Sequence, residues 1–193
     1  MLAKLQAFER FANFAYVPMP GGAAAVKNPL RMAYGALWAF DLLEHPGAQA
    51  ALDALGSQAD ICGAMIEQGI NTPMTSSVGR LFDAASALLG VCANPTYEGE
   101  GACLLEGLAH EAESGGASES DAAARERYAV AITKNAASET STAQDTSVLL
   151  LDAEPTFRAL LDDFAAGVPK PVIARRFHDA IIEVVVQAAE LVR

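Results

Sequence analysis

Apolar residues recur at intervals of three and four along most of the chain, and glycine or proline marks the end of each run. This spacing puts the apolar side chains on one face of a helix, so it predicts a mainly α-helical protein. The expected helices lie at residues 30–44, 48–55, 58–68, about 154–165 and 171–192.

The stretch 72–109 carries two further predicted helices and the densest glycine punctuation of the chain. Either Ser76 or Ser77 can cap the first helix, because a serine oxygen accepts hydrogen bonds from the unpaired N–H groups of a first turn. Gly90 is expected to end this helix. The second helix is expected to begin at Tyr97-Glu98-Gly99.

Two regions have features of β-strands. Residues 1–17 combine an apolar spacing of three, typical of a helix, with many aromatic residues, typical of strands, so both alternatives stay open. The short apolar runs at 128–132 and 148–151 predict the two strands of a hairpin. Between the helices and this hairpin, the small and acidic residues 114–124 predict a solvated loop.

Composition narrows the classes of partner. Of 193 residues, 52% are hydrophobic, which is enough for a core, and the net charge is −11. Nucleic acids and anionic membranes need clustered Lys and Arg, so neither is expected as a partner. The three cysteines have no CxxC spacing, and neither a signal peptide nor a membrane span is apparent, so we expect a cytoplasmic protein.

The chain offers little conventional catalytic or metal-binding chemistry. Its three histidines lie apart, and HxxxH and HExxH patterns are absent, so no metal ligand and no catalytic residue is predicted. The acidic pair Asp162 and Asp163 is expected on a solvated helix face.

Four stretches carry a resemblance to a known family. GRLFDAASALLG followed by TYEGEGACLLEGLA resembles the C-terminal domain of the HypF carbamoyltransferases of hydrogenase maturation, and more distantly the tRNA threonylcarbamoyl transferases TsaD. The other three occur in the same order as in HypF and cover nearly the whole chain. They are FERFANFAYVPMPGGAAAVKNPLRMA, GINTPMTSS and IARRFHDAI.

The resemblance implies a fold. It indicates the helical insert subdomain of an actin-like ATPase fold, mainly α, with short β-hairpin elements at about 1–17 and 128–151. It thereby favours strands over a helix for the N-terminal segment. We expect a single partial domain over 1–193, made of a hairpin and loop (1–22), a helical core (27–113), an acidic loop with a short hairpin (114–151) and two C-terminal helices (154–193).

The resemblance also implies a reaction. HypF uses carbamoyl phosphate and ATP to make carbamoyl-adenylate, and it passes the carbamoyl group to a cysteine of its partner HypE for the cyanide ligands of NiFe hydrogenase. The family's metal ligands and phosphate-binding glycine turn do not occur in this sequence. We therefore expect a fragment that is inactive alone. The alternative is a stand-alone helical binding or interaction module without catalysis.

Gly79 and Asp83 are the first candidate site residues, because four residues separate them and they share one helix face. A carboxylate accepts well from hydroxyl donors, and a bare glycine lets a ligand approach the helix. The resemblance implies that both lie at the nucleotide and that Asp83 takes the ribose hydroxyls. The alternative for Asp83 is an exposed acid stabilised by the helix dipole.

Three other positions complete the candidates. Glu98, in the YEG motif of HypF, is either close to the nucleotide or an acid favoured at a helix start. Lys27 and Arg31 either face the cleft of the full enzyme or are surface bases beside a turn. Arg80 stands where the TsaD pattern has a glutamate, so no TsaD role is carried over to it.

The last predicted helix, residues 171–192, is apolar on most sides. A helix of this kind needs burial on more than one face. We therefore expect the isolated chain to associate with itself through this helix.

Overall fold

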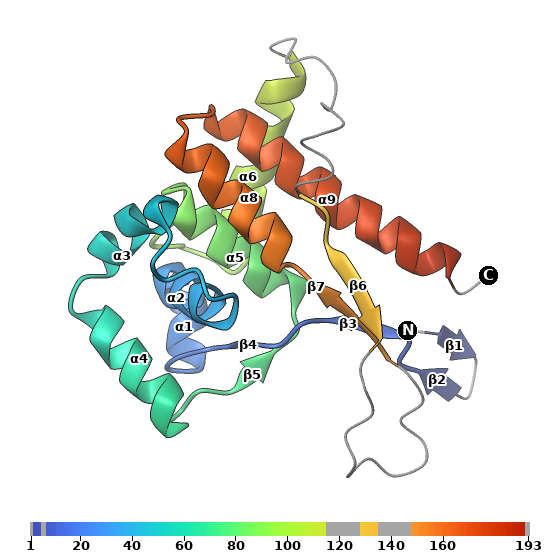
Figure 1. Cartoon of the computed structure of the whole chain (residues 1–193), viewed down its shortest axis with the longest axis horizontal. Coiled ribbons are helices and arrows are strands. Elements are labelled where there is room, and N and C mark those ends of the chain that lie inside the picture. Colours follow the sequence, from blue (N-terminus) through green and yellow to red (C-terminus); the bar gives the residue numbers. More distant parts are fainter. Residues whose placement is uncertain (1, 5–6, 115–127, 135–147, 192–193) are drawn as a thin grey trace.

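A group of helices fills one side of the molecule, and a small sheet lies at the other (Figure 1). The computed structural model describes all residues except 1, 5–6, 115–127, 135–147 and 192–193. The described part is mostly helical, as predicted. Nearly all of the predicted acidic loop, residues 114–124, lies outside it.

The first helices follow the proline and glycine signals. Asn28 precedes α2, its side-chain oxygen accepts from the N–H of Leu30 at 3.2 Å, and Pro29 is the first helical residue. The helices of this region are α1 (Ala23–Lys27), α2 (Pro29–Ala39), the 3-10 turn η1 (Pro46–Ala48), α3 (Gln49–Leu55) and α4 (Gln58–Gln68).

The prediction that the second of these helices runs to Glu44 was wrong, because α2 ends at Ala39. Asp41 has a φ of 55°, in the left-handed region, and the N–H of Leu42 donates to the carbonyl of Leu37 at 2.8 Å. This geometry terminates a helix whether or not the apolar pattern continues.

Helix α5 (Val78–Leu88) comes from the central stretch, and α6 (Glu100–Ser114) follows it. Ser77 directly precedes α5, but its side chain makes no capping hydrogen bond, so the predicted serine cap was wrong. Instead, the N–H of Ser77 donates to Thr75 Oγ1 at 3.1 Å, which fixes the chain as it enters the helix. Gly90 has a φ of 63° and follows the last turn, as predicted.

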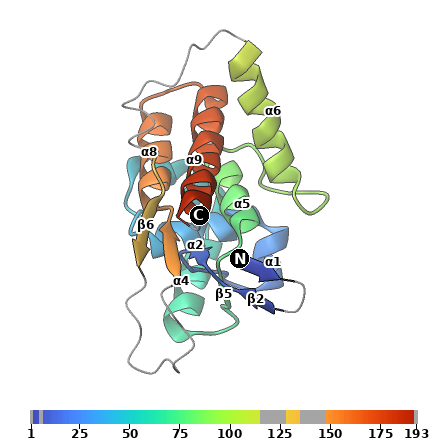
Figure 2. The same ribbon diagram turned by 90° about the vertical axis from the view of Figure 1, so that its right-hand side faces the viewer.

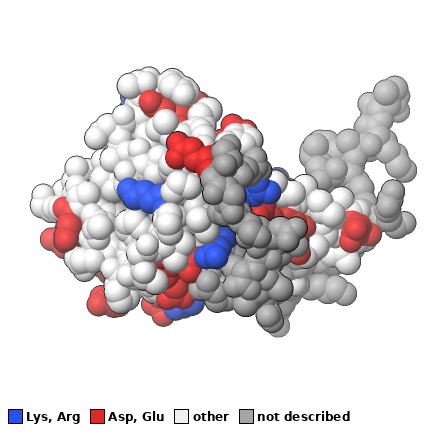
Figure 3. Space-filling view, turned by 90° about the horizontal axis from the view of Figure 1, so that it is seen from above, with Lys and Arg blue, Asp and Glu red and all other residues white. Residues whose placement is uncertain are grey.

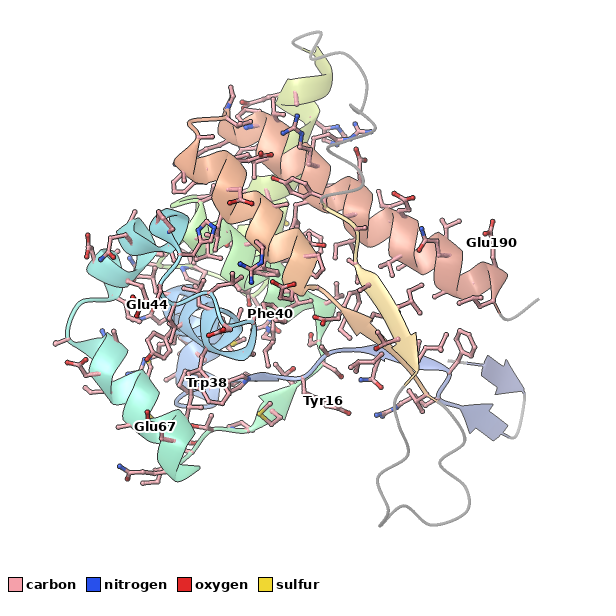
Figure 4. All side chains as sticks on the ribbon, in the orientation of Figure 1. Tyr16, Trp38, Phe40, Glu44, Glu67 and Glu190 are labelled. Atoms are coloured by element: carbon pink, nitrogen blue, oxygen red, sulfur yellow. The ribbon has the colours of Figure 1, made fainter. Side chains whose placement is uncertain are left out.

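The C-terminal helices are α8 (Glu154–Ala165) and α9 (Lys170–Glu190). Helix α9 lies between α8 and α6 and packs against both (Figure 2). Its buried face includes Ile173, Phe177, Ile181 and Val184. Glu190 lies near the free end of α9, away from the other helices (Figure 4).

The strands only partly follow the prediction of a hairpin over residues 1–17. Strands β1 (Leu2–Lys4) and β2 (Ala7–Glu9) do form an antiparallel hairpin. Strand β3 (Ala12–Phe14) leaves it and pairs in parallel with β7 (Leu149–Asp152). Parallel neighbours need a long crossover, and the helices between these strands supply it.

Two further strand pairs connect distant parts of the chain. Strand β6 (Ala131–Lys134) pairs antiparallel with β7, which confirms the hairpin predicted from the two short apolar runs. The resulting sheet has the order β3-β7-β6. Strand β4 (Val17–Pro18) pairs with β5 (Met74–Thr75), which places the entry to α5 beside the N-terminal segment.

One cluster of buried side chains connects the sheet with the helices. Its aromatic centre runs from Phe40 to Phe157, with ring centroids 5.2 Å apart, and on to Phe177 at 5.9 Å. Phe40 lies in the middle of the molecule (Figure 4). Helix α5 packs against α2 and α6, so the side chains at its start are held from several directions.

Asp163 corrects another expectation, because it is only 4% exposed rather than solvated. Its carboxylate accepts from the hydroxyl of Tyr128 at 3.0 Å and from Arg176 at 2.5 Å. This network connects the chain before β6 to α8 and α9. Its neighbour Asp162 does face solvent and contacts His45 Nε2 at 3.2 Å.

Candidate functional site

Helix α5 begins with a glycine that internal packing does not require. A Cβ added at Gly79 would meet only Ser77 Oγ, at 3.6 Å, which is an ordinary contact. By contrast, a Cβ at Gly35 in α2 would lie 2.1 Å from the carbonyl oxygen of Pro18. Glycine in a helix costs about 1 kcal/mol relative to alanine, so Gly79 has a cost that no close approach within the described chain explains.

Asp83 lies one turn after Gly79 and is only 5% exposed. The alternative of an exposed acid at the helix start was therefore wrong. Burial raises the pKa of the Asp83 carboxyl above its usual value, the guanidinium of Arg80 opposes that rise, and the charge of Glu98 adds to it. The site therefore holds a desolvated carboxylate beside a single compensating cation.

Arg80 is that cation, and sequence reasoning assigned it no role. It is 9% exposed, and its Nη1 lies 3.0 Å from Asp83 Oδ2. Although this atom is buried, it has no hydrogen bond of good geometry among the described residues, so its contact with Asp83 is an ion pair with poor alignment. Opposite charges three residues apart on a helix were the available signal.

Glu98 meets the other side of the same guanidinium. Arg80 Nη2 donates to Glu98 Oε1 at 3.3 Å, and the Glu98 side chain is 80% exposed. Helix α6 begins two residues later, at Glu100, whose carboxylate accepts from the N–H and hydroxyl of Thr96. These hydrogen bonds lower the pKa of Glu100. The Glu100 carboxylate thus holds the segment that precedes α6, while Glu98 is directed at Arg80 of α5.

The structure therefore brings Asp83 and Glu98 together around Arg80, with Gly79 adjacent in α5. Whether this group contacts a nucleotide stays a prediction. Chemically, it offers a buried carboxylate beside a cation that favours its ionised form, one turn from a glycine with free space above its Cα. Such a carboxylate is suited to accept hydrogen bonds from hydroxyl groups.

The remaining candidates, Lys27 and Arg31, have other surroundings. Arg31 Nε donates to Gln58 at 3.1 Å and Nη1 donates to the carbonyl of Pro20 at 3.3 Å, so Arg31 joins the turn before α1 to α4. Gly21 has a φ of 92°, a conformation that L side chains rarely adopt, which explains the glycine in that turn. Lys27 is exposed in the last turn of α1. Neither has a recorded contact with Asp83 or Glu98.

Three general features of the described residues concern metal binding, membrane-spanning helices and surface charge. Among the residues that the structure describes, no three His, Cys, Asp or Glu side chains are grouped so that they could hold a metal ion. None of the helices in the described part is long and apolar enough to cross a membrane. On the face drawn in Figure 3, the basic groups lie apart from one another, next to acidic or uncharged surface.

Comparison with solved structures shows that the chain is similar to part of two larger proteins. The chain matches a crystal structure of full-length HypF in a phosphate- and nucleotide-bound form over 99% of its length, with a TM-score of 0.76 and 27% identity. It matches HypF of T. kodakarensis over 90% of its length, with a TM-score of 0.63 and 28% identity. It covers 26% and 21% of those two chains.

Sequence comparison gives the same family. The chain is 40% identical to carbamoyltransferase HypF2 of Cupriavidus necator over 103 residues, which is 53% of this chain and 12% of that protein. It is 39% identical to carbamoyltransferase HypF of Rhodobacter capsulatus over 112 residues, or 56% of this chain and 14% of that protein. A family profile described as the second subdomain of the Kae1-like carbamoyltransferase domain matches residues 1–193. The chain therefore belongs to the HypF carbamoyltransferase family, as the second subdomain of its Kae1-like domain.

Proposed function

We propose that this chain forms the helical wall of the nucleotide site in a HypF-type carbamoyltransferase. The observation that carries the proposal is the match of nearly the whole chain to full-length HypF in a nucleotide- and phosphate-bound form. In the same proposal, the chain is the helical insert subdomain of an actin-like ATPase fold and works in the cytoplasm.

Each residue of the Arg80 group has a role in this proposal. Asp83 accepts hydrogen bonds from the ribose hydroxyls of ATP, because an ionised carboxylate is acceptor-only. Gly79 leaves room for the ligand beside α5, and Glu98 borders the same space from the segment before α6. For Lys27 and Arg31 the proposal is only that they face the cleft. The hydrogen bonds of Arg31 to Gln58 and Pro20 already explain where its side chain lies.

In the reaction proposed for the whole enzyme, water cleaves carbamoyl phosphate into carbamate and inorganic phosphate, and a carbamate oxygen then attacks the α-phosphorus of ATP to give carbamoyl-adenylate and pyrophosphate. A cysteine thiolate of HypE then attacks the carbamoyl carbon, and AMP leaves. In this reaction, the residues of this chain bind and orient the adenosine part of ATP. The groups that stabilise the developing phosphate charge, on which such catalysis depends most, are expected from the rest of the enzyme. We therefore expect no carbamoylation by the 193-residue chain alone.

A titration of the chain with ATP tests the binding role. In the ¹⁵N-labelled protein, ATP should shift the amide signals of Gly79 and its neighbours in α5. Asp83→Asn keeps the shape of the side chain but removes its charge, so it should abolish these shifts. The matched control is Asp53→Asn on the exposed face of α3, which should leave them unchanged. Equal shifts in wild type and Asp83→Asn would refute the role of Asp83.

One observation favours a second function, that of an interaction module. The outer face of α9 carries Ile182, Val185 and Val186, which are 60%, 55% and 52% exposed. They lie three and four residues apart and so form one apolar stripe on the helix. The proposed occupant for the isolated chain is the same stripe of a second copy. Light scattering across a concentration series tests this, and a strictly monomeric profile would refute it.

A further inference from the structure

We infer that Arg80 is a positioning residue of the nucleotide site, where it orients the Asp83 carboxylate and joins it to the segment that carries Glu98. The inference rests on the proposed function, since it assigns a role within that site. It assigns a role to Arg80 that the TsaD pattern does not supply, because TsaD has a glutamate at this position.

The first support is the way Asp83 is held. Arg80 Nη1 approaches one carboxylate oxygen, Oδ2, at 3.0 Å. Within the described chain, no second donor is recorded for this carboxylate. Its other oxygen, Oδ1, is therefore left to accept from a ligand. The ion pair lies on the Oδ2 side of the carboxylate, so Oδ1 is the oxygen that Asp83 can present to a ligand.

The second support is burial. Arg80 and Asp83 are both more than nine-tenths buried, at 9% and 5% exposure. A desolvated carboxylate tends to take up a proton, and a protonated carboxyl presents an O–H donor in place of one acceptor. Burial raises the pKa of Asp83 and Arg80 counteracts it. The guanidinium thereby favours the ionised form of Asp83, in which both oxygens are acceptors.

The third support is the second contact of the guanidinium. Arg80 Nη2 reaches Glu98 at 3.3 Å, on the segment between α5 and α6. The planar fork of arginine can meet two carboxylates at once, which the point charge of lysine does less well. Glu98 is mostly exposed, so this contact contributes little to folding stability. Its effect is to hold the segment that carries Glu98 in a fixed position relative to Asp83.

A purely structural role explains this arrangement less well. Replacing a buried ion pair by apolar residues of similar size is often neutral or stabilising, so stability alone gives little reason for the pair. Arg80 also follows Gly79 directly, and Asp83 lies one turn after this glycine, which has no packing reason. A charged pair beside an open helix start points to a ligand instead.

The experiment compares Arg80→Met and Arg80→Lys with the wild-type chain. The control, Arg158→Met, removes the same side chain from an ion pair with Glu154 on α8. Two quantities are measured, the affinity for ATP from the amide shifts and the pKa of Asp83 from its ¹³C carboxyl signal. Thermal unfolding of each variant verifies that it is folded at the measuring temperature.

Arg80→Met should weaken ATP binding about 10-fold, equivalent to ~1.4 kcal/mol, and should raise the pKa of Asp83. Arg80→Lys should keep the pKa of Asp83 near the wild-type value but recover only part of the affinity, because it loses the contact with Glu98. Arg158→Met should change neither quantity. A merely structural arginine would change thermal stability and the pKa of Asp83 but leave the affinity for ATP constant in the folded variants.

The outcomes separate this inference from the proposed function. ATP binding that is lost in Asp83→Asn but unchanged in both Arg80 variants would overturn the role of Arg80 and leave the nucleotide site standing. Absence of ATP binding by the wild-type chain would overturn both. Full recovery of affinity by lysine would overturn the bridging of Glu98. An unfolded Arg80→Met leaves the lysine variant to decide by the same two measurements.

Discussion

Gly79→Ala separates folding from ligand binding at one position. Gly79 is the second residue of α5, and the added Cβ would meet only Ser77 Oγ at 3.6 Å. Alanine restricts the unfolded chain and suits a helix better, so folding stability should increase by about 0.5–1 kcal/mol. For a chain of this size, that gain corresponds to a rise in Tm of roughly 1–4 °C.

The same substitution should weaken ATP binding, because the new methyl group occupies the space through which the ligand approaches α5. Urea unfolding followed by circular dichroism measures the stability, and the amide shifts measure the binding. The matched control is Gly35→Ala in α2, whose Cβ would lie 2.1 Å from the carbonyl of Pro18. That variant should lose about 1–3 kcal/mol through overpacking.

The reasoning about Gly79 fails in either of two cases. If Gly79→Ala destabilises the chain, the glycine has a structural reason that the described contacts do not include. If the variant is more stable and binds ATP as well as the wild type, the glycine does not admit a ligand. Only a gain in stability with a loss of affinity agrees with a helix start kept bare for binding.

Three further predictions concern stability, pH and association. Asp163→Ala should cost about 3 kcal/mol in urea unfolding, because it leaves Arg176 partly buried without its carboxylate; a loss below 1 kcal/mol would contradict the buried network. The pKa of Asp83 is raised in the folded state. Its contribution to the free energy of unfolding is therefore present below the pKa of an unfolded aspartate, about 4, and is lost as the pH rises through the folded-state pKa. Asp83→Asn should therefore flatten the pH dependence of unfolding above pH ~4, and an unchanged profile would show that Asp83 titrates normally. Ile182→Lys should make the isolated chain monomeric in light scattering at unchanged Tm, whereas Gln187→Lys on the same helix should not, and equal behaviour of the two variants would exclude the apolar stripe.

Local sequence signals predicted most helix positions because the residues that end each helix act locally. Asn28 and Pro29 begin α2 as expected, and Gly56 and Gly69 follow the ends of α3 and α4 with φ values of 58° and 64°. The hairpin of β6 and β7 was predictable for the same reason, as two apolar runs between polar neighbours. These features depend on neighbours in sequence.

Features that depend on distant contacts were not predictable in this way. The parallel pairing of β3 with β7 joins residues that lie far apart in the chain, and no local pattern encodes it. The early end of α2 depends on Asp41 in a left-handed conformation, although apolar residues continue beyond it. The burial of Asp163 also depends on a distant contact, because its hydrogen-bond partner Tyr128 comes from another part of the chain.

At the candidate site, the sequence indicated the residues but not their environment. The resemblance selected Gly79, Asp83 and Glu98, and the structure groups Asp83 and Glu98 around one cation. The burial of Asp83 could not be read from its place in the first turns of a helix, where acids are usually exposed. No role was predicted for Arg80 because the comparison with TsaD supplied none, although its spacing from Asp83 indicated an ion pair.

The central claim is that the start of α5 is the adenosine-facing border of a nucleotide site. Intermolecular nuclear Overhauser effects between ATP and the labelled 193-residue chain test it most directly. The account predicts contacts from the ribose protons to the Gly79 α-protons and to the Asp83 side chain, and their loss in Asp83→Asn. Ribose contacts to another part of the chain, with none at α5, would contradict it.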